Sequence, residues 1–272
     1  MSSPFETLRL TRRDDGIVWL TLARPEKLNA FSLQMADELL LAGQELVEDS
    51  QVRGVIVRGE GRSFCVGIDT AEFDGNLHEQ DEPSTDQEDP TIERILKGQD
   101  CLTWLEEAPF PTVAAIHGHA LGVGLQVALA CDLRLVARDA KLGLLEQRWG
   151  LMPDGGGTQR LPRLVGPAKA KELIFTAVTI DGDEAERIGL ANRVVDADAL
   201  SDAVTALASE LARQPPLPIQ HVKEAVNRSH ELSIRDGLRL EAEGQAACLR
   251  SSDFVEALRA AAEQRPSRFL GQ

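Results

Sequence analysis

The amino-acid sequence predicts a protein of mixed α/β class, and three observations favour this class. Short apolar stretches with strand-type alternation are separated by stretches whose apolar residues recur at helical spacing. Glycine-rich turns connect the two kinds of stretch. From about residue 201 to residue 264 the spacing is helical almost throughout. We therefore expect strands and helices that alternate over residues 1–200, followed by a helical region at 201–272.

The composition is that of a water-soluble globular protein that does not bind nucleic acid. Of the 272 residues, 43% are hydrophobic and 27% are charged, both ordinary values. The formal net charge of −15 argues against nucleic acid and against an anionic membrane surface as partners. The N-terminus has no apolar core of the signal-peptide type, and no apolar run approaches the ~20 residues of a membrane span. We expect a cytoplasmic protein.

The first elements are justified by alternation and by turn chemistry. Residues 5–12 and 16–22 alternate as strands, and the turn at 13–16 has a composition typical of a hairpin. A helix is expected to begin after Ser32, a residue type favoured at the N-cap position. A buried strand follows within 52–61, and it ends in a glycine turn. Residues 74–90 are acidic and poor in apolar residues, so we expect a mobile loop, either a lid or a plain insertion.

The later elements follow the same logic. A helix is expected at 91–107, a strand at 112–116 and a helix within 167–177. In the turn that follows, Asp183 is expected to cap a short helix. The helical region after residue 201 is interrupted at 214–218 by the string QPPLP. Its amphipathic segments have too few apolar residues to form a core of their own, so they must pack against another surface.

The stretch 115–161 carries the candidate chemistry. Glycines at 118, 122 and 124 precede an apolar run that predicts a buried helix. The free N–H groups at the start of such a helix can stabilise an oxygen that becomes negative during a reaction. Glu146 and Asp154 follow within a short distance, so two carboxylates are available. A dinucleotide-binding fingerprint is excluded because its third glycine would fall on Val127.

The sequence predicts no metal site and no cofactor. The four cysteines, at 65, 101, 131 and 248, form no CxxC pair and have no zinc spacing. His117 and His119 flank Gly118, but no further ligand is spaced to complete a site with them. We interpret them as packing or hydrogen-bonding residues. No Ser, Cys or His is spaced as a nucleophile and its base, which disfavours a nucleophilic hydrolase.

Four strings follow one another in the chain, namely PEKLNAF (25–31), SFCVGID (63–69), HGHALGVGLQVALACD (117–132) and MPDGGGTQRLPRLVG (152–166). In their order and spacing they resemble the crotonase superfamily, also called the enoyl-CoA hydratase/isomerase family. The resemblance implies a spiral of ββα repeats, a C-terminal helical region that makes trimer contacts, and an acyl-CoA thioester as substrate. It also implies a homo-oligomer, either a trimer or a dimer of trimers.

The resemblance also implies a set of substrate-binding residues. The family's CoA-binding segment falls on Lys27 and Ala30, with Val66 and Gly67 beside the thioester. Two backbone amides, those of Ile68 and Val123, would form the oxyanion hole. The side chains of Val66 and Val123 are larger than those usual in the family, so they are expected to narrow the pocket. The tail RPSRF (265–269) resembles a basic ending that reaches a neighbouring subunit's CoA site, and a frayed tail is the alternative.

Three positions bear on the reaction. Hydratases of the family have two glutamates. The equivalent positions in this chain hold Gln126 and Glu146, so only one of the two is an acid here. Asp154 occupies a position where dienoyl-CoA isomerases have an aspartate and hydratases a glycine, although Pro-Asp-Gly is also ordinary turn chemistry. Apolar neighbours, namely Leu144, Leu145 and Trp149, are expected to raise the pKa of Glu146. We therefore expect an enoyl-CoA isomerase. A 2-enoyl-CoA hydratase and a non-catalytic acyl-CoA-binding protein remain alternatives.

Overall fold

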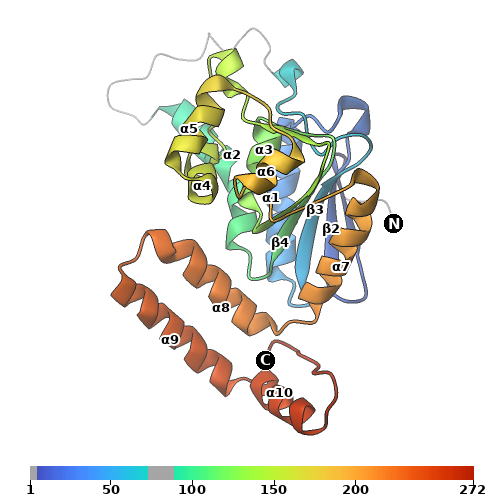
Figure 1. Ribbon diagram of the computed structural model, residues 1–272, viewed down its shortest axis with the longest axis vertical. Helices are drawn as coiled ribbons and strands as arrows, with labels where there is room; N and C mark the ends of the chain where they lie inside the picture. The colour runs from blue at the N-terminus through green and yellow to red at the C-terminus, as the bar shows by residue number, and fades with distance from the viewer. Residues whose placement is uncertain (1–4, 73–88) are drawn as a thin grey trace.

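The computed structural model of the chain describes residues 5–72 and 89–272. A six-stranded sheet with helices on both sides forms its body, and three helices extend from one end (Figure 1). The loop predicted at 74–90 lies almost wholly outside the described residues. The strands are β1 (Leu8–Arg12), β2 (Ile17–Leu22), β3 (Gly54–Gly59), β4 (Thr112–Ile116), β5 (His119–Leu121), β6 (Leu133–Ala137), β7 (Lys141–Gly143) and β8 (Arg193–Val195).

The helices are of very unequal length, and several of the short ones are 3₁₀ turns. The α-helices are α1 (Leu33–Glu48), α2 (Pro90–Glu107), α3 (Val123–Ala130), α4 (Gly157–Val165), α5 (Pro167–Thr176), α6 (Gly182–Arg187), α7 (Leu200–Ala212), α8 (Pro216–Asn227), α9 (Ile234–Arg250) and α10 (Ser252–Ala262). The 3₁₀ turns are η1 (Pro25–Lys27), η2 (Thr70–Glu72), η3 (Glu146–Trp149), η4 (Ala197–Ala199) and η5 (Arg228–His230).

The main sheet has the strand order β1-β2-β3-β4-β6-β8. The pair β1–β2 is antiparallel, as the predicted hairpin requires, and every later pair is parallel. Parallel strands need covered faces, which is why β3 and β4 consist almost entirely of buried residues. A second, two-stranded parallel sheet, β5–β7, lies beside the main one and carries the glycine-rich turns.

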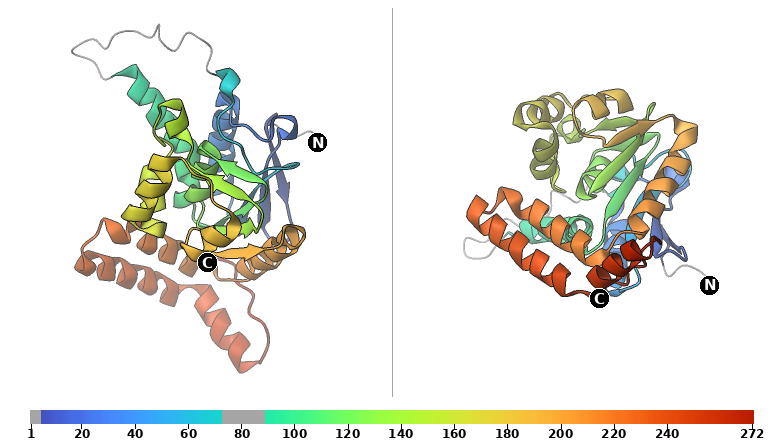
Figure 2. Two further views of the ribbon diagram at one scale, coloured as in Figure 1. Left: turned by 45° about the horizontal axis from the view of Figure 1, so that its top comes forward. Right: turned by 60° about the horizontal axis from the view of Figure 1, so that its bottom comes forward.

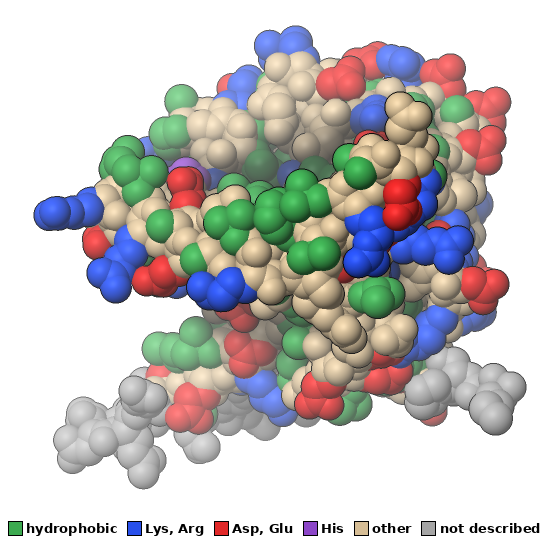
Figure 3. Space-filling model, turned by 90° about the horizontal axis from the view of Figure 1, so that it is seen from below, with side chains coloured by type: hydrophobic (Ala, Val, Ile, Leu, Met, Phe, Trp, Pro, Cys, Tyr) green, Lys and Arg blue, Asp and Glu red, His purple; other side chains and the backbone are tan. Residues whose placement is uncertain are grey.

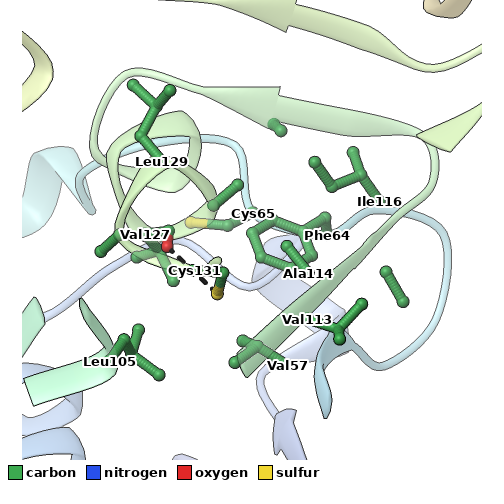
Figure 4. Close-up of a cluster of buried hydrophobic side chains, with 14 of the residues drawn as sticks. Val57, Phe64, Cys65, Leu105, Val113, Ala114, Ile116, Val127, Leu129 and Cys131 are labelled. Carbon is green, nitrogen blue, oxygen red and sulfur yellow. Dashed lines mark hydrogen bonds between the residues drawn. The ribbon is translucent and has the colours of Figure 1, made fainter. Parts of the chain in front are cut away.

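Helix α3 is the buried centre of the molecule. Seven of its eight residues are buried, which confirms the buried helix predicted after the glycine turn. Figure 4 shows Val127 and Leu129 of α3, with Cys131 just after it, gathered with Phe64 and Cys65. A Cβ added at Gly124 would lie only 2.5 Å from the carbonyl oxygen of Cys65, so glycine is required where these segments cross. Packing in the core thus fixes the position of α3, the helix that follows the glycine turn of the candidate site.

Local capping explains most element boundaries. The Ser32 hydroxyl accepts a hydrogen bond from the amide of Met35, which confirms the predicted N-cap. The prediction for Asp183 is wrong, because the carboxylate of Asp181 caps α6 by accepting from the amide of Glu184. The predicted interruption at 214–218 is shorter than expected. Pro216 begins α8, as proline in the first turn of a helix can.

The C-terminal helices divide into two groups. Helix α7 contributes Leu200, Val204 and Ala208 to the core of the sheet. Helices α8, α9 and α10 extend away from it, and α8 and α9 lie side by side (Figures 1 and 2). Neither α8 nor α9 buries a large apolar side chain. The division of the chain at residue 200 stays a prediction, and the extended arm begins with α8. None of the described helices is both long and apolar enough to cross a membrane.

Candidate active site

Two glycine turns from distant parts of the chain meet at one point. Backbone hydrogen bonds join their flanks, from Cys65 N to His119 O (2.8 Å) and from Leu121 N to Cys65 O (3.0 Å). Gly67 and Gly122 both have positive φ, at +105° and +53°, which favours glycine at both turns. A Cβ added at Gly122 would lie 3.7 Å from the Cα of Gly67 and 3.5 Å from Oε1 of Glu146. The two turns and the glutamate therefore surround a common space.

The residue after each of these glycines offers a backbone amide. Val123 is the first residue of α3, so its N–H has no intrahelical acceptor. Ile68 pairs with Phe31 in an isolated bridge, in which Phe31 N donates to Gly67 O and Asp69 N donates to Phe31 O. Across the described part of the chain, no acceptor is found for the N–H of Ile68 or of Val123. Two unpaired amides beside one space are what an oxyanion hole requires.

Gln126 is held at both ends of its side-chain amide. It lies one turn into α3, and only 1% of its surface is exposed. Its Nε2 donates to Oε1 of Glu146 (2.8 Å), and its Oε1 accepts from the amide of Gly157 at the start of α4 (2.9 Å). The amide therefore links α3, η3 and α4. Both its donor nitrogen and its acceptor oxygen are hydrogen-bonded.

Glu146 has one oxygen bound and one oxygen free. Oε1 accepts from Gln126, whereas Oε2 is buried and has no hydrogen-bond partner among the described residues. Burial raises the pKa of Glu146, and the negative charge of Asp154 acts in the same direction. The nearby backbone amides of residues 146 and 145 and the hydrogen bond from Gln126 oppose this shift. A buried, unpartnered carboxylate oxygen is costly to folding and is suited to accepting a proton.

Asp154 lies in the turn between η3 and α4, and it is exposed. Its carbonyl oxygen accepts from Nε2 of Gln99 on α2 (2.7 Å), so the turn is fixed to that helix. The residue therefore has the turn role that its sequence context indicated. Its carboxylate also acts electrostatically on Glu146. The side chain of Asp154 is thus exposed to water, whereas Oε2 of the half-buried Glu146 is not.

A comparison with known proteins identifies the family. The model of the enoyl-CoA hydratase/isomerase family matches residues 12–272. The chain belongs to this family. Mouse mitochondrial methylglutaconyl-CoA hydratase is 37% identical over 268 residues, which cover 97% of this chain and 82% of the mouse protein.

Solved structures of the family confirm the crotonase-like fold. An enoyl-CoA hydratase from Bacillus anthracis superposes with a TM-score of 0.87 at 31% identity, and the match covers 98% of this chain and all of the other (100%). A Thermobifida fusca YX protein solved in complex with CoA superposes with a TM-score of 0.80 at 37% identity, covering 89% of this chain and 93% of that one. The predicted family and fold are confirmed.

The segment that resembles the family's CoA-binding region is built around an ion-pair cluster. Asp69 accepts from Nζ of Lys27 and from Nη2 of Arg24, both at 2.8 Å. These hydrogen bonds, from Lys27 first and Arg24 second, hold the pKa of Asp69 well below its usual range. Lys27 is exposed, whereas Ala30 is buried and its carbonyl accepts from Nη1 of Arg24 (2.6 Å). Val66 is half-buried.

Sequence reasoning missed Asn29, which holds this segment in place. Asn29 adopts φ of +57°, and the preceding Leu28 adopts +52°, so two consecutive non-glycine residues are left-handed. The buried Asn29 side chain donates to Glu60 O (2.9 Å) and Ser63 O (2.8 Å), and it accepts from Arg24 N (2.9 Å). The only available hint was that asparagine tolerates the left-handed region better than most residues.

One expectation about the neighbours of Glu146 is wrong. Leu144 is buried and Leu145 is half-buried, as a desolvated carboxylate requires. Trp149, however, is 67% exposed and does not enclose Glu146. The side chain lies at the end of η3, and Gly150 then turns the chain away through a φ of +70°. The carboxylate of Glu146 instead contacts Gln126 of α3 and lies beside Gly122, the residue before that helix.

The remaining candidates have structural roles. His119 shares a hydrogen bond with Ser63 Oγ (3.0 Å) and His117 with Gly61 O (3.0 Å), which confirms their interpretation as hydrogen-bonding residues. Within residues 5–72 and 89–272 no cluster of His, Cys, Asp or Glu could hold a metal ion. Burial raises the pKa of Cys65, Cys101 and Cys131 to about 12, so these thiols are inert.

The C-terminal tail is fastened to its own chain. Arg265 forms a two-pronged ion pair with Glu256 (2.6 and 3.0 Å), and it also contacts Glu263. The amides of Leu270 and Gly271 donate to the carboxylate of Asp253. A frayed tail is therefore excluded. Arg265 is engaged within its own chain, whereas Arg268 uses only its backbone amide in the contacts found.

Proposed function

We propose that the protein is an enoyl-CoA isomerase that shifts a double bond by proton transfer, with Glu146 as the base. The observation that carries this proposal is the side chain of Gln126, which stands where hydratases of the family have a second glutamate. Both ends of its amide are hydrogen-bonded, and an amide cannot accept a proton at neutral pH. One buried carboxylate with a free oxygen is sufficient for a proton shift. The reaction needs no cofactor besides the CoA of the substrate, and we place it in the cytoplasm.

The proposed mechanism has two proton transfers. The thioester oxygen of a 3-enoyl-CoA accepts hydrogen bonds from the amides of Ile68 and Val123. Glu146 Oε2 removes a proton from C2, and the electron pair moves onto the thioester oxygen to form a dienolate. Each oxyanion donor of this kind contributes about 3–4 kcal/mol in enzymes where it has been removed. Protonation at C4, by Glu146 or by Asp154, restores the carbonyl and leaves the double bond between C2 and C3.

Hydration of a 2-enoyl-CoA is the second candidate, because several similar proteins bear the name of a hydratase. Hydration requires one group to hold and deprotonate water and another to deliver a proton to C2. Glu146 alone would have to perform both steps. A protein that binds acyl-CoA without turnover is a third candidate. The buried, unpartnered Oε2 of Glu146 argues against it, since such an atom costs stability and has no use in binding alone.

The substitution Gln126→Glu distinguishes isomerase from hydratase. A glutamate there would keep the hydrogen bond from Gly157 and would bring a second carboxyl to within hydrogen-bond distance of Glu146. Two carboxyls so close share a proton, which supplies the acid and the base of a hydratase. We expect the wild type to convert 3-enoyl-CoA to 2-enoyl-CoA and to hydrate crotonyl-CoA poorly, and the variant to hydrate it measurably faster.

The absorbance of the conjugated thioester follows both reactions, rising on isomerisation and falling on hydration. Wild-type and variant protein are compared side by side on crotonyl-CoA, a 3-enoyl-CoA and a 3,5-dienoyl-CoA. Rapid hydration by the wild type, with no isomerisation of either other substrate, would overturn the proposal and leave Asp154 as a turn residue only.

A further inference from the structure

Arg160, one turn into α4, has a guanidinium that is almost buried, and only 12% of its side chain is exposed. Its Nε donates to Oε2 of Glu106 at the end of α2 (2.7 Å), and its Nη1 donates to the carbonyl of Gly155 (3.0 Å). Its Nη2 reaches Oγ1 of Thr103, three residues before Glu106 (3.4 Å). All three guanidinium nitrogens are therefore directed at α2 and at the turn that precedes α4.

The guanidinium lies against the turn formed by residues 155–157. A Cβ added at Gly156 would lie only 2.0 Å from Nη1 of Arg160, so a side chain at that position would displace the guanidinium. The backbone amide of Arg160 donates to Gly156 O (2.9 Å), while its Nη1 binds Gly155 O. One residue thus holds two consecutive carbonyls of the turn.

The same turn fixes the side-chain amide next to the proposed base. The amide of Gly157 donates to Oε1 of Gln126 (2.9 Å), and Nε2 of Gln126 donates to Oε1 of Glu146 (2.8 Å). The packing here is close, since a Cβ added at Gly155 or Gly157 would lie 3.2 or 3.1 Å from Oε1 of Gln126. A continuous set of contacts therefore leads from Arg160 to the carboxylate of Glu146. If the turn were released, the amide of Gln126 could rotate and would no longer present Nε2 to that carboxylate.

We propose that Arg160 is a positioning residue for the reaction at Glu146, which rests on the proposed function. Arg160 holds the 155–157 turn, the turn holds the amide of Gln126, and that amide orients the carboxylate. The forked shape of the guanidinium is needed because its Nε and Nη1 bind Glu106 and Gly155 at the same time. An ammonium group would keep the charge, but its single nitrogen cannot reproduce the spacing of the two donors.

The substitution Arg160→Met removes the fork and keeps an apolar stem. For a 3-enoyl-CoA, kcat should fall by about 10- to 100-fold because the base is no longer held in its productive position. KM should change by less than about threefold, since the substrate-binding amides of Ile68 and Val123 are retained. Arg163→Met is the matched control, because Arg163 lies one turn further along α4, is exposed and takes part in none of these hydrogen bonds. A kcat in Arg160→Met equal to that in Arg163→Met would overturn the proposal.

The pH profile of kcat separates positioning from a general loss of structure. The hydrogen bond from Gln126 lowers the pKa of Glu146, against the effect of burial. Without that hydrogen bond the pKa rises further, so the acid limb of the profile should move to higher pH in Arg160→Met. A lower kcat with the acid limb unmoved would mean that Arg160 is structural only.

The other charges around Glu146 are the same in these variants. Asp154, in the turn, raises its pKa, and Arg148 lies two residues away in η3. Helix α3 has no charged residue, and α5, which packs against η3, carries the Lys169–Glu172 ion pair. A shift of the acid limb therefore comes from the substituted side chain and the contacts that it held.

The variant Arg160→Lys distinguishes the fork from the charge. It keeps a cation at this position, so it should show the same loss of kcat and the same direction of pH shift as Arg160→Met, each smaller. Wild-type kcat and an unshifted profile in Arg160→Lys would overturn the role of the fork. Arg160→Lys also provides the test if Arg160→Met does not fold.

A second readout of the Glu146 pKa does not depend on turnover. The stability difference between Glu146→Gln and its parent varies with pH through the pKa of Glu146. Measured by urea unfolding, this variation should extend to higher pH in the Arg160→Lys background than in the wild type. That shift, together with failure to isomerise any enoyl-CoA, would refute the isomerase and leave the positioning of the carboxylate standing. Isomerisation by the wild type, with kcat and both pH dependences unchanged in the Arg160 variants, would refute the positioning alone.

Discussion

Glu146 combines burial with an incomplete set of hydrogen bonds. Gln126 fixes one carboxylate oxygen, and nothing among the described residues satisfies the other. Such an arrangement reduces the stability of the folded state. Proteins retain it where the group acts on a bound ligand. The fixed oxygen, Oε1, orients the carboxylate and lies 3.5 Å from the place that a Cβ on Gly122 would occupy, so the carboxylate stands beside the glycine turn.

The substitution Glu146→Gln should lower turnover by about 10²–10⁴-fold, the usual contribution of a positioned acid or base. CoA-ester binding should change little, because the amide keeps the shape of the side chain. Since burial raises the pKa of Glu146, wild-type activity should fall as the pH decreases through that raised value, where the base becomes protonated. Steady-state rates across pH provide the measurement. Near-wild-type rates in the variant on every accepted substrate would show that Glu146 is not the base.

The same substitution should remove a pH dependence of stability. The folded protein binds a proton at Glu146 more readily than the unfolded chain does, because burial raises the folded-state pKa. The stability contributed by this group is therefore fully present below the ordinary glutamate pKa, and it is lost as pH rises through the raised one. Urea unfolding at a series of pH values should show the wild type losing stability relative to Glu146→Gln as pH increases. A constant difference would mean that Glu146 is not desolvated.

At the scale of single residues, the sequence predicted which residues lie at the candidate site better than it predicted which residues they contact. The glycine turns and Gln126 lie on strings with family spacing, Glu146 lies between two of these strings, and the structure brings them to one place. The Arg24–Asp69 pair and the contacts of Asn29 to residues 60–63 join segments that are tens of residues apart. No local pattern encodes such contacts, because they depend on how strands align after folding. The exposure of Trp149 has a local cause, because η3 ends in a left-handed glycine that directs the chain outward.

Among the helices, α8 is attached to the core by Lys223 and by Asn227, whose Nδ2 donates to Glu106 O (2.8 Å). Lys223 pairs with Asp132 (2.8 Å) and donates to the carbonyls of Leu105 (2.9 Å) and Phe110 (3.0 Å), where α2 ends. Burial raises the pKa of Asp132, whereas the charge of Lys223 and the hydrogen bonds from Thr112 oppose the shift. The side chain of Lys223, only 8% exposed, thereby satisfies two carbonyls and one carboxylate.

Lys223→Met should therefore destabilise the protein by about 3–5 kcal/mol, the cost of leaving a buried charge unpaired. Lys169→Met is the matched control, because Lys169 pairs with the exposed Glu172 within one helix and should contribute less than about 1 kcal/mol. Urea unfolding monitored by circular dichroism compares the two variants. A loss in Lys223→Met no greater than that in Lys169→Met would show that this contact does not hold α8 on the core.

The helices and strands were largely predictable from the sequence. The residues at which they begin and end depended on capping hydrogen bonds, which the spacing of apolar residues does not specify. The hairpin, the cap at Ser32 and the buried helix α3 follow from alternation, N-cap chemistry and an apolar run. The cap of α6 fell on Asp181 and not on Asp183, because two aspartates two residues apart are equally good candidates by type. Helix α7 was not distinguished from the helices after it, since its amphipathic face alone does not indicate which surface it covers.

At the scale of the whole molecule, the arm formed by α8, α9 and α10 exposes an apolar surface with no partner within the described chain. Figure 3, viewed from the side of these helices, shows hydrophobic side chains gathered along them. Ile234 is 84% exposed, an unusual state for isoleucine in a monomer. The exposed apolar residues of the arm and tail are Val222, Val226, Ile234, Leu238, Leu249, Phe254, Val255, Leu258 and Leu270. A surface of this kind marks a protein–protein contact.

We expect this surface to be buried in a trimer or in two stacked trimers, as the family resemblance implies. Light scattering at micromolar concentration should give three or six times the mass of the chain. Leu238→Asp, which places a charge on the exposed face of α9, should shift the mass toward the monomer, because an unpaired carboxylate would be buried at the contact. Leu41→Asp on α1, where the leucine is similarly exposed, is the control and should leave the mass unchanged. A wild type that scatters as a monomer would refute the assembly, and the apolar arm would then require a partner other than a copy of itself.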